Sequence, residues 1–292
     1  MNGRVYLSSG SLSNYGLDRV FELARSAGFD GVELIVDGRT DSVHPDYLKK
    51  LMIRHSLPIS AVHSPFSFID PPGWEKDEIS RVKRSIALAE ELGAGLLVLH
   101  SPFFTDHAYR RWLENDLRET QAATSVVVAV ENMPHSRKLG GVLGVWLGWP
   151  SLQEAGAGRW WRLLPSFLRP PCFPLSALAA LERFPHIVLD TTHLGTGGLD
   201  PIKVFNRLGE RVAHVHLSNF DGREHIELRK GRLDLEGFLR HLSERGYHGS
   251  CCLEIIPEYF SSHDERFTFE LLKANLELIR RNLSSASPPG AG

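Results

Sequence analysis

The stretch "HIVLDTTHLGTGG", residues 186–198, joins a short apolar run to polar side chains. Val188 and Leu189 have the character of a buried strand. Asp190 and His193 follow at the point where such a strand should leave the core. Because a carboxylate and an imidazole are both common ligands of divalent metals, the stretch predicts a buried strand whose end has a chemical role.

Eight apolar runs of this kind are spaced along the 292-residue chain. They cover residues 4–9, 31–36, 59–65, 95–102, 126–134, 186–193, 212–220 and 250–258. Val, Ile and Leu dominate the runs with little polar alternation, which is typical of parallel strands covered on both faces. The runs therefore predict a parallel sheet of eight strands.

Amphipathic stretches separate most of these runs and predict helices. They cover residues 17–29, 78–94, 106–123, 233–247 and 266–283. The first places Val20, Phe21 and Ala24 on one face, and Gly28 and Gly93 stand where the first two helices should end. Strands that alternate with helices predict an α/β protein, a single-domain (β/α)8 TIM barrel, and a doubly wound open sheet is the rival architecture.

Two segments depart from this alternation. Residues 136–174, after the fifth strand, form a Trp-rich insertion that contains Trp146, Trp149, Trp160 and Trp161. This insertion is expected either to pack on the barrel as a satellite helix pair or to form a lid or partner surface at its mouth. Residues 284–292, "SSASPPGAG", have the low complexity of a disordered tail. The barrel is therefore expected to occupy residues 1–283.

Composition limits the classes of partner. The formal net charge of −2 provides no overall basic field, so nucleic acid is not an expected partner. The three cysteines show no CxxC spacing, which favours a reducing compartment. The first residues do not resemble a signal peptide, and no apolar run approaches the roughly 20 residues that span a bilayer. These features predict a cytoplasmic protein with no membrane partner.

Histidines and acidic residues gather where the predicted strands end. They are His63, His100, Glu131, Asp190, His193, His216, His225 and Glu254. A single such histidine is more often structural, but a parallel barrel brings all carboxyl ends to one face. Carboxylates buried together need a compensating charge, and imidazoles with carboxylates and no thiolate indicate a divalent transition metal. Strand alternation is expected to turn His214 away from His216, which leaves His214 a supporting or structural role.

Six motifs carry a resemblance to a known family. They are "VHSPF", "LVLHSP", "AVENMP", "LDTTHLGTGGLD", "HVHLSN" and "LEIIPE". In this order they resemble the xylose-isomerase-like TIM-barrel superfamily, which includes sugar (phosphate) isomerases and epimerases and the AP endonuclease family 2. The resemblance spans most of the chain and leaves out the Trp-rich insertion and the tail.

The sugar branch of this superfamily implies a metal site and an acid–base pair. The resemblance implies one divalent cation, Mn, Co, Mg or Zn, held by Glu131, Asp190, His216 and Glu254. Glu131 and Glu254 would also exchange protons with opposite faces of the substrate. Substrate would be bound by His63, His100, His193 and Arg223. Arg223 is shifted by one residue from the substrate-binding arginine of that branch.

The endonuclease branch implies further zinc ions and further ligands. The additional ligands would be His63, His100, His193 and His225. Arg223 stands where that branch has an aspartate ligand, and a cation there disfavours a third metal. Asp221 could take the place of that ligand only if its loop were rearranged.

Three functions are consistent with these residues. The expected one is a metal-dependent isomerase or epimerase of a small sugar or related polyhydroxy carbonyl compound, which removes a proton and forms an enediolate. One alternative is an AP-endonuclease-type, metal-dependent phosphodiesterase that acts on abasic DNA. The other is a non-catalytic barrel that serves as a binding module. The expected partner is a small sugar-like substrate, and assembly into a homo-oligomer is left open.

Overall fold

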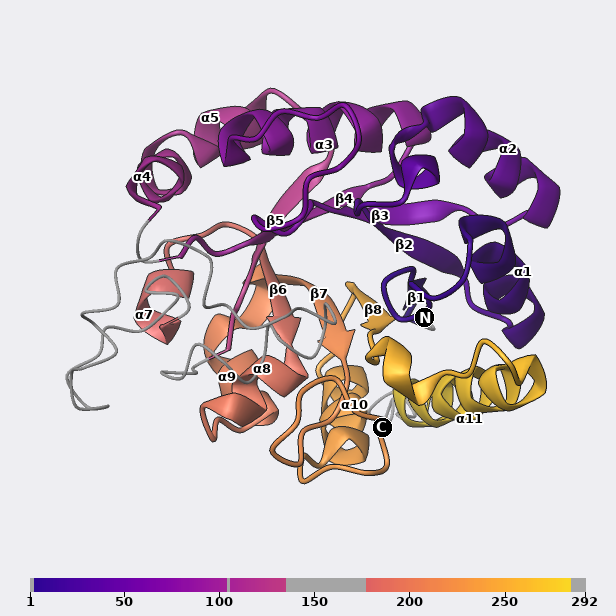
Figure 1. Ribbon diagram of the computed structural model, residues 1–292. Helices are drawn as coiled ribbons and strands as arrows, with labels where there is room; N and C mark the ends of the chain where they lie inside the picture. Colours follow the sequence, from indigo (N-terminus) through magenta and orange to yellow (C-terminus); the bar gives the residue numbers. More distant parts are fainter. Residues whose placement is uncertain (1–2, 104–105, 135–176, 285–292) are drawn as a thin grey trace, which may run out of the picture.

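Eight short parallel strands close into a barrel in the computed structural model of the chain (Figure 1). They are β1 (Val5–Ser8), β2 (Gly31–Ile35), β3 (Ile59–His63), β4 (Leu96–His100), β5 (Val127–Glu131), β6 (Ile187–Asp190), β7 (Val212–Leu217) and β8 (Ser250–Leu253). Strands pair in chain order, and β8 pairs with β1 through the register of Leu253 with Leu7. The predicted single-domain TIM barrel is confirmed, and the rival open sheet is wrong.

The structure describes residues 3–103, 106–134 and 177–284. The predicted Trp-rich insertion, residues 136–174, and the predicted tail beyond Ser284 lie outside these ranges. All eight strands lie within the described ranges, so the barrel is closed by residues on either side of the insertion.

Helices surround the barrel, as Figure 1 shows. They are α1 (Leu17–Ala27), α2 (Pro45–His55), α3 (Glu78–Leu92), α4 (His107–Asn115), α5 (Leu117–Ala122), α7 (Leu178–Leu181), α8 (Thr191–Thr196), α9 (Pro201–Leu208), α10 (Leu235–Glu244) and α11 (Glu265–Leu283). Helix α1 buries Val20, Phe21 and Ala24 as predicted and ends at Gly28, whose φ of 99° is left-handed. The single helix predicted over residues 106–123 is divided into α4 and α5 at Asp116, whose φ of −106° and ψ of −14° depart from ideal helical values.

Alternate residues of each strand face the barrel interior and form layers. At the carboxyl end, the strands contribute His63, His100, Glu131, Asp190 and His216. Two positions earlier on β3 to β6 the layer is apolar and packs as one cluster that includes Ala61, Val98, Ala129 and Val188. On β7, the residue two positions before His216 is His214, and on β8, the residue two positions before Glu254 is Cys252. This layer is therefore apolar on one side of the barrel and polar on the other.

Strand β6 ends at Asp190, whereas the predicted run continued to His193. The Asp190 carboxylate accepts a hydrogen bond from the backbone N–H of His193 at 2.7 Å, which caps helix α8. Residues Thr191 and Thr192 are therefore helical, and the strand ends at Asp190, where the sequence analysis expected it to leave the core. The cap keeps His193 near the strand end, where only 5% of its surface is exposed.

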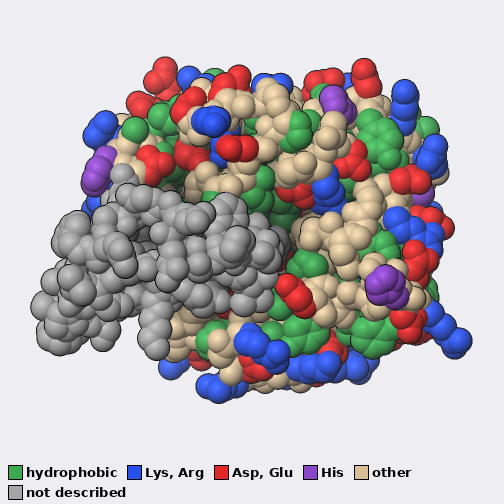
Figure 2. All heavy atoms as spheres, in the orientation of Figure 1, with side chains coloured by type: hydrophobic (Ala, Val, Ile, Leu, Met, Phe, Trp, Pro, Cys, Tyr) green, Lys and Arg blue, Asp and Glu red, His purple; other side chains and the backbone are tan. Residues whose placement is uncertain are grey.

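Charges of both signs are interspersed over the described part of the face in Figure 2. Binding to a nucleic-acid backbone normally draws on clustered Lys and Arg, whereas on most of this face acidic side chains lie among the basic ones, and basic side chains gather only along its lower edge. Among the helices that the structure describes, none has the length and apolar character needed to cross a membrane.

Candidate metal centre

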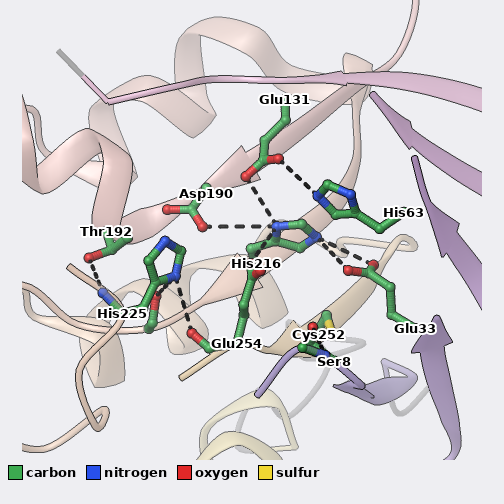
Figure 3. Close-up of polar contacts among 12 residues, drawn as sticks. Ser8, Glu33, His63, Glu131, Asp190, Thr192, His216, His225, Cys252 and Glu254 are labelled. Carbon is green, nitrogen blue, oxygen red and sulfur yellow. Dashed lines mark hydrogen bonds and ion pairs between the residues drawn. The ribbon is translucent and has the colours of Figure 1, made fainter. Parts of the chain in front are cut away.

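The residues predicted at separate strand ends lie together at the carboxyl end of the barrel (Figure 3). Three groups of histidines and acids there have potential ligand atoms within 4.8 Å of one another. They are Glu131, Asp190, His216 and Glu254; His63, His100 and Glu131; and Asp190, His193 and His225. Every strand-end histidine and acid proposed from the sequence as a metal ligand belongs to at least one group, whereas Arg223 and the conditional ligand Asp221 belong to none.

The four-residue group is arranged around the imidazole of His216. Its Nδ1 atom lies 2.9 Å from Oε2 of Glu254, 3.2 Å from Oε1 of Glu131 and 3.9 Å from Oδ2 of Asp190. None of the four residues is more than 3% exposed. Three carboxylates from β5, β6 and the residue after β8 therefore face one nitrogen from β7 in a site nearly closed to water.

Charge balance in this group depends on the imidazoles. Burial raises the pKa of Glu131, but the charge of His216 and hydrogen bonds from other imidazoles hold that pKa well below its usual range. Burial prevails at Asp190 and raises its pKa. Burial lowers the pKa of His216, yet the surrounding carboxylates, Glu33 and Glu254 first, raise it well above its usual value. Positive charge at this point thus stabilises the buried carboxylates, as a bound cation would.

Three carboxylate oxygens identify where a cation fits. Oε2 of Glu131, Oδ2 of Asp190 and Oε2 of Glu254 are buried and accept no well-oriented hydrogen bond. Buried polar atoms normally have partners, and these three belong to the residues that surround Nδ1 of His216. Three oxygen donors and one imidazole suit Mn, Co, Mg or Zn without selecting sharply among them. The residues therefore fit a divalent cation.

The second group extends from Glu131 toward β3 and β4. Oε2 of Glu131 lies 3.2 Å from Nε2 of His100 and 3.5 Å from Nε2 of His63. Nδ1 of His63 bonds to the carbonyl of Ser64 at 2.8 Å, which directs its Nε2 toward the carboxylate. Burial lowers the pKa of His100 to about 4, so this imidazole is neutral at physiological pH. The imidazoles of His63 and His100 can each coordinate a cation through a lone pair or, with a proton on the same nitrogen, donate a hydrogen bond to a substrate oxygen.

The third group joins β6 to the loop after β7. Nδ1 of His193 bonds to the carbonyl of Asn132 at 2.8 Å, and its Nε2 lies 3.3 Å from Nε2 of His225. Burial lowers the pKa of His193, but the charge of Asp190 and a hydrogen bond to Glu131 raise it to about 10. An imidazolium at His193 is therefore the stable form at neutral pH when no metal displaces its proton.

Arg223 and Asp221 remain outside this third group. Arg223 is 69% exposed in its side chain and pairs with Asp221 at 3.0 Å. Asp221 thus does not replace the aspartate ligand of the endonuclease branch in this arrangement. Glu224, which the sequence reasoning did not single out, is a half-buried acid of the same loop; burial raises its pKa, while His193 and His225 oppose that effect.

Two buried residues next to His216 correct the sequence analysis. Glu33, in the middle of β2, was missed, although an acidic residue inside the apolar run "GVELIV" was an available signal. His214 was expected to turn away from His216, and this is wrong. Residues two apart on a strand share a face, and both imidazoles contact the carboxylate of Glu33.

Comparisons with known proteins identify the family and fold of this chain. The model of the xylose isomerase-like TIM barrel family matches residues 21–156 and 176–281. An uncharacterized protein of Mycobacterium leprae is 30% identical over 283 residues, which cover 96% of this chain and 98% of that protein. The crystal structure of a D-tagatose 3-epimerase-like protein has a TM-score of 0.62 at 21% identity, with 96% of this chain and 100% of that chain covered.

A nuclease-family barrel has a similar fold as well. The crystal structure of AP endonuclease, family 2, from Brucella melitensis has a TM-score of 0.60 at 17% identity, and the match covers 87% of this chain and 93% of that one. At such identities the two solved structures show a shared fold alone. The family model spans most of the chain and the mycobacterial relative spans nearly all of it, so this chain belongs to the xylose isomerase-like TIM barrel family.

Proposed function

We propose that this chain is a divalent-metal-dependent isomerase or epimerase of a small sugar or related polyhydroxy carbonyl compound. One observation carries the proposal: the carboxylates of Glu131, Asp190 and Glu254 surround Nδ1 of His216 at a strand-end site that is almost fully buried. The carboxyl end of a TIM barrel is where its enzymes place their catalytic residues. Membership of the family supports the same assignment.

The acid–base chemistry is assigned to Glu131 and Glu254. They come from β5 and from the residue after β8, so they approach the site from different parts of the barrel wall. One carboxylate takes the proton from the carbon beside the substrate carbonyl. The other returns a proton to the opposite face of that carbon, which epimerises it, or to the neighbouring carbon, which isomerises the sugar. A bound divalent cation supplies Lewis-acid stabilisation of negative charge on the substrate oxygen.

Four further residues are assigned to the substrate. His63, His100 and His193 lie at the edge of the four-residue group and can donate or accept hydrogen bonds with hydroxyl groups. Arg223 is exposed on the loop after β7, next to the buried His225, and would contact the part of the substrate that is distant from the reacting carbon.

Solvent isotope exchange tests this function directly. Purified protein loaded with Mn or Co should transfer deuterium from D2O into the carbon-bound positions of one member of a ketose, keto-inositol and hydroxypyruvate panel. Removal of the ion with a chelator should stop the exchange, and addition of the ion should restore it. Bound metal without exchange on any member of the panel would instead support the binding-module alternative.

A second candidate is an AP-endonuclease-type phosphodiesterase. The observation in its favour is that the second and third groups add His63, His100, His193 and His225 beside the first. The position of Arg223 outside the third group and the interspersed surface charge count against it. Cleavage of abasic DNA by the protein, with binding that weakens as salt rises, would decide for this candidate.

A further inference from the structure

A charged residue lies beneath the metal-binding group, in the interior of the barrel. Glu33 is fully buried, and so are His214 and Cys252, whose potential ligand atoms lie within 4.8 Å of its carboxylate. On the other side of the barrel the layer of His214 and Cys252 is the apolar cluster that contains Ala129 and Val188. An ionised carboxylate is costly to place in such surroundings without partners. Its position therefore requires compensation from the residues that it contacts.

The contacts of Glu33 lead directly to His216. Oε1 of Glu33 lies 3.2 Å from Nε2 of His216, and Oε2 lies 3.0 Å from Nε2 of His214. Nδ1 of His214 is in turn 2.7 Å from the hydroxyl of Ser250. Figure 3 shows His216 between Glu33 on one side and Glu131, Asp190 and Glu254 on the other. The two nitrogens of one imidazole are thus divided between a buried carboxylate and the metal-binding group.

We propose that Glu33 is a positioning residue for the metal centre, and that His214 and Ser250 hold it in place. A neutral imidazole has one N–H and one lone pair, and the acceptor that it meets decides which nitrogen has which. Oε2 of Glu33 accepts the hydrogen bond from Nε2–H of His216 at 3.3 Å, so Nδ1 would present its lone pair to the cation. The negative charge of the carboxylate also makes that nitrogen a stronger ligand. This inference rests on the divalent cation of the proposed function.

A metal ion held by Glu33, His214 and Cys252 is the alternative explanation for the same cluster, because the ligand atoms of these three residues also lie within 4.8 Å of one another. Oε2 of Glu33 and Nε2 of His214 lie 3.0 Å apart, but they are not oriented for a hydrogen bond. Oε2 of Glu33 is hydrogen-bonded to Nε2 of His216 at 3.3 Å, and this contact, on which the positioning role rests, does not involve Cys252. Cys252 therefore distinguishes the two explanations.

The test compares metal binding by the full chain and two buried variants. Ion-free protein is titrated with Mn or Co by calorimetry, and ions per chain are counted after dialysis. Glu33→Gln keeps the size of the side chain but removes its charge, and only one of the two end atoms of the amide can accept a hydrogen bond. We expect about 10- to 100-fold weaker binding with the same number of ions per chain. The control, Cys252→Ser, changes a residue of the same layer and should bind as the wild-type chain does.

A spectroscopic readout separates positioning from loss of structure. In the Zn-loaded wild-type chain, long-range 1H–15N spectra should show His216 with the metal at Nδ1 and the proton at Nε2. The same signal should shift or broaden in Glu33→Gln. If that variant does not fold, Glu33→Asp retains the charge and His214→Gln removes the anchor, and each should weaken binding in the same direction.

The outcomes separate this inference from the proposed function. A wild-type chain that binds no divalent ion overturns the metal-dependent function itself. If the wild-type chain binds an ion and Glu33→Gln, or the fallback variants Glu33→Asp and His214→Gln, bind it equally tightly, the positioning role alone is overturned. Loss of one ion per chain in both Glu33→Gln and Cys252→Ser would replace the positioning role with a second metal site.

Discussion

Nε2 of His193 lies 3.3 Å from Nε2 of His225, and the two rings are nearly perpendicular, at 88°. Two N–H groups cannot point at each other at this separation, so at least one of the two nitrogens presents a lone pair. Asp190 contributes the third potential ligand of this group. The pair is therefore satisfied either by one shared proton or by a cation, and counting bound ions distinguishes the two.

We expect one tightly bound Mn or Co ion per chain, held by the four-residue group. Asp221→Ala should not reduce this number, because Asp221 pairs with the exposed Arg223 and belongs to no ligand group. His225→Gln should also retain the ion. Metal analysis after dialysis gives the number of ions bound per chain in the wild-type protein, in Asp221→Ala and in His225→Gln. Three zinc ions per wild-type chain, with one lost in His225→Gln, would contradict this expectation and support the nuclease candidate.

Replacement of Glu254 by Gln should abolish proton exchange and weaken metal binding. The amide of Gln can neither take the carbon proton nor supply the negative charge that faces Nδ1 of His216. We expect the rate of deuterium incorporation to fall by at least about 100-fold. Glu258→Gln is the matched control, since Glu258 is an exposed glutamate in the short turn η6 (Pro257–Tyr259) beyond β8. Full exchange by Glu254→Gln would remove this residue from the mechanism.

Metal binding should release protons and strengthen as pH rises. The pKa of His216 is raised well above its usual value, so the ion-free chain keeps this imidazole protonated at neutral pH. A metal at Nδ1 must displace that proton, and each proton released makes the affinity rise by up to about tenfold per pH unit. Calorimetry in buffers of different ionisation heat measures the number released. Equal affinity at about pH 6 and pH 8 would show that no proton is displaced.

Asn132→Ala should destabilise the fold beside the site. The Asn132 side chain accepts from the backbone N–H of Asp190 at 2.7 Å and donates to the Asp190 carbonyl at 3.1 Å. Both buried backbone groups lose their partner in the variant, which should lower the free energy of unfolding by about 2–4 kcal/mol. Asn206→Ala is the control, because Asn206 is exposed and its side chain is hydrogen-bonded to Nε2 of His241 at the surface, so the change should alter stability by about 0.5 kcal/mol or less. Denaturant unfolding of both variants checks the difference, and equal stability would show that water replaces the Asn132 side chain.

Arg223→Ala should raise KM and leave kcat and the bound metal unchanged. Arg223 lies outside the ligand groups, so its loss removes a substrate contact that is equally strong in the ground and transition states. Steady-state kinetics on the substrate found by isotope exchange gives the two constants. A fall in kcat with KM unchanged would show that this residue acts on the reacting carbon.

The local signals in the sequence predicted most of the fold. Apolar runs and amphipathic stretches report which residues are buried over a few turns or strand positions, and they placed all eight strands. Strand ends were less accurate, because β6 ends where the side chain of Asp190 caps α8, a hydrogen bond that periodicity does not record. Residues 136–174 and the cytoplasmic assignment stay predictions.

The sequence by itself determined which side chains stand at the strand ends, since each follows its own apolar run. Only the tertiary structure decided which of them meet. Closure of the barrel brings Glu33 to His216 across 183 positions of the chain and leaves the neighbouring loop residue Arg223 on the surface. The physical reason is that strand register and loop course depend on contacts between distant segments, whereas the apolar pattern that predicts a buried strand lies in neighbouring residues of the sequence.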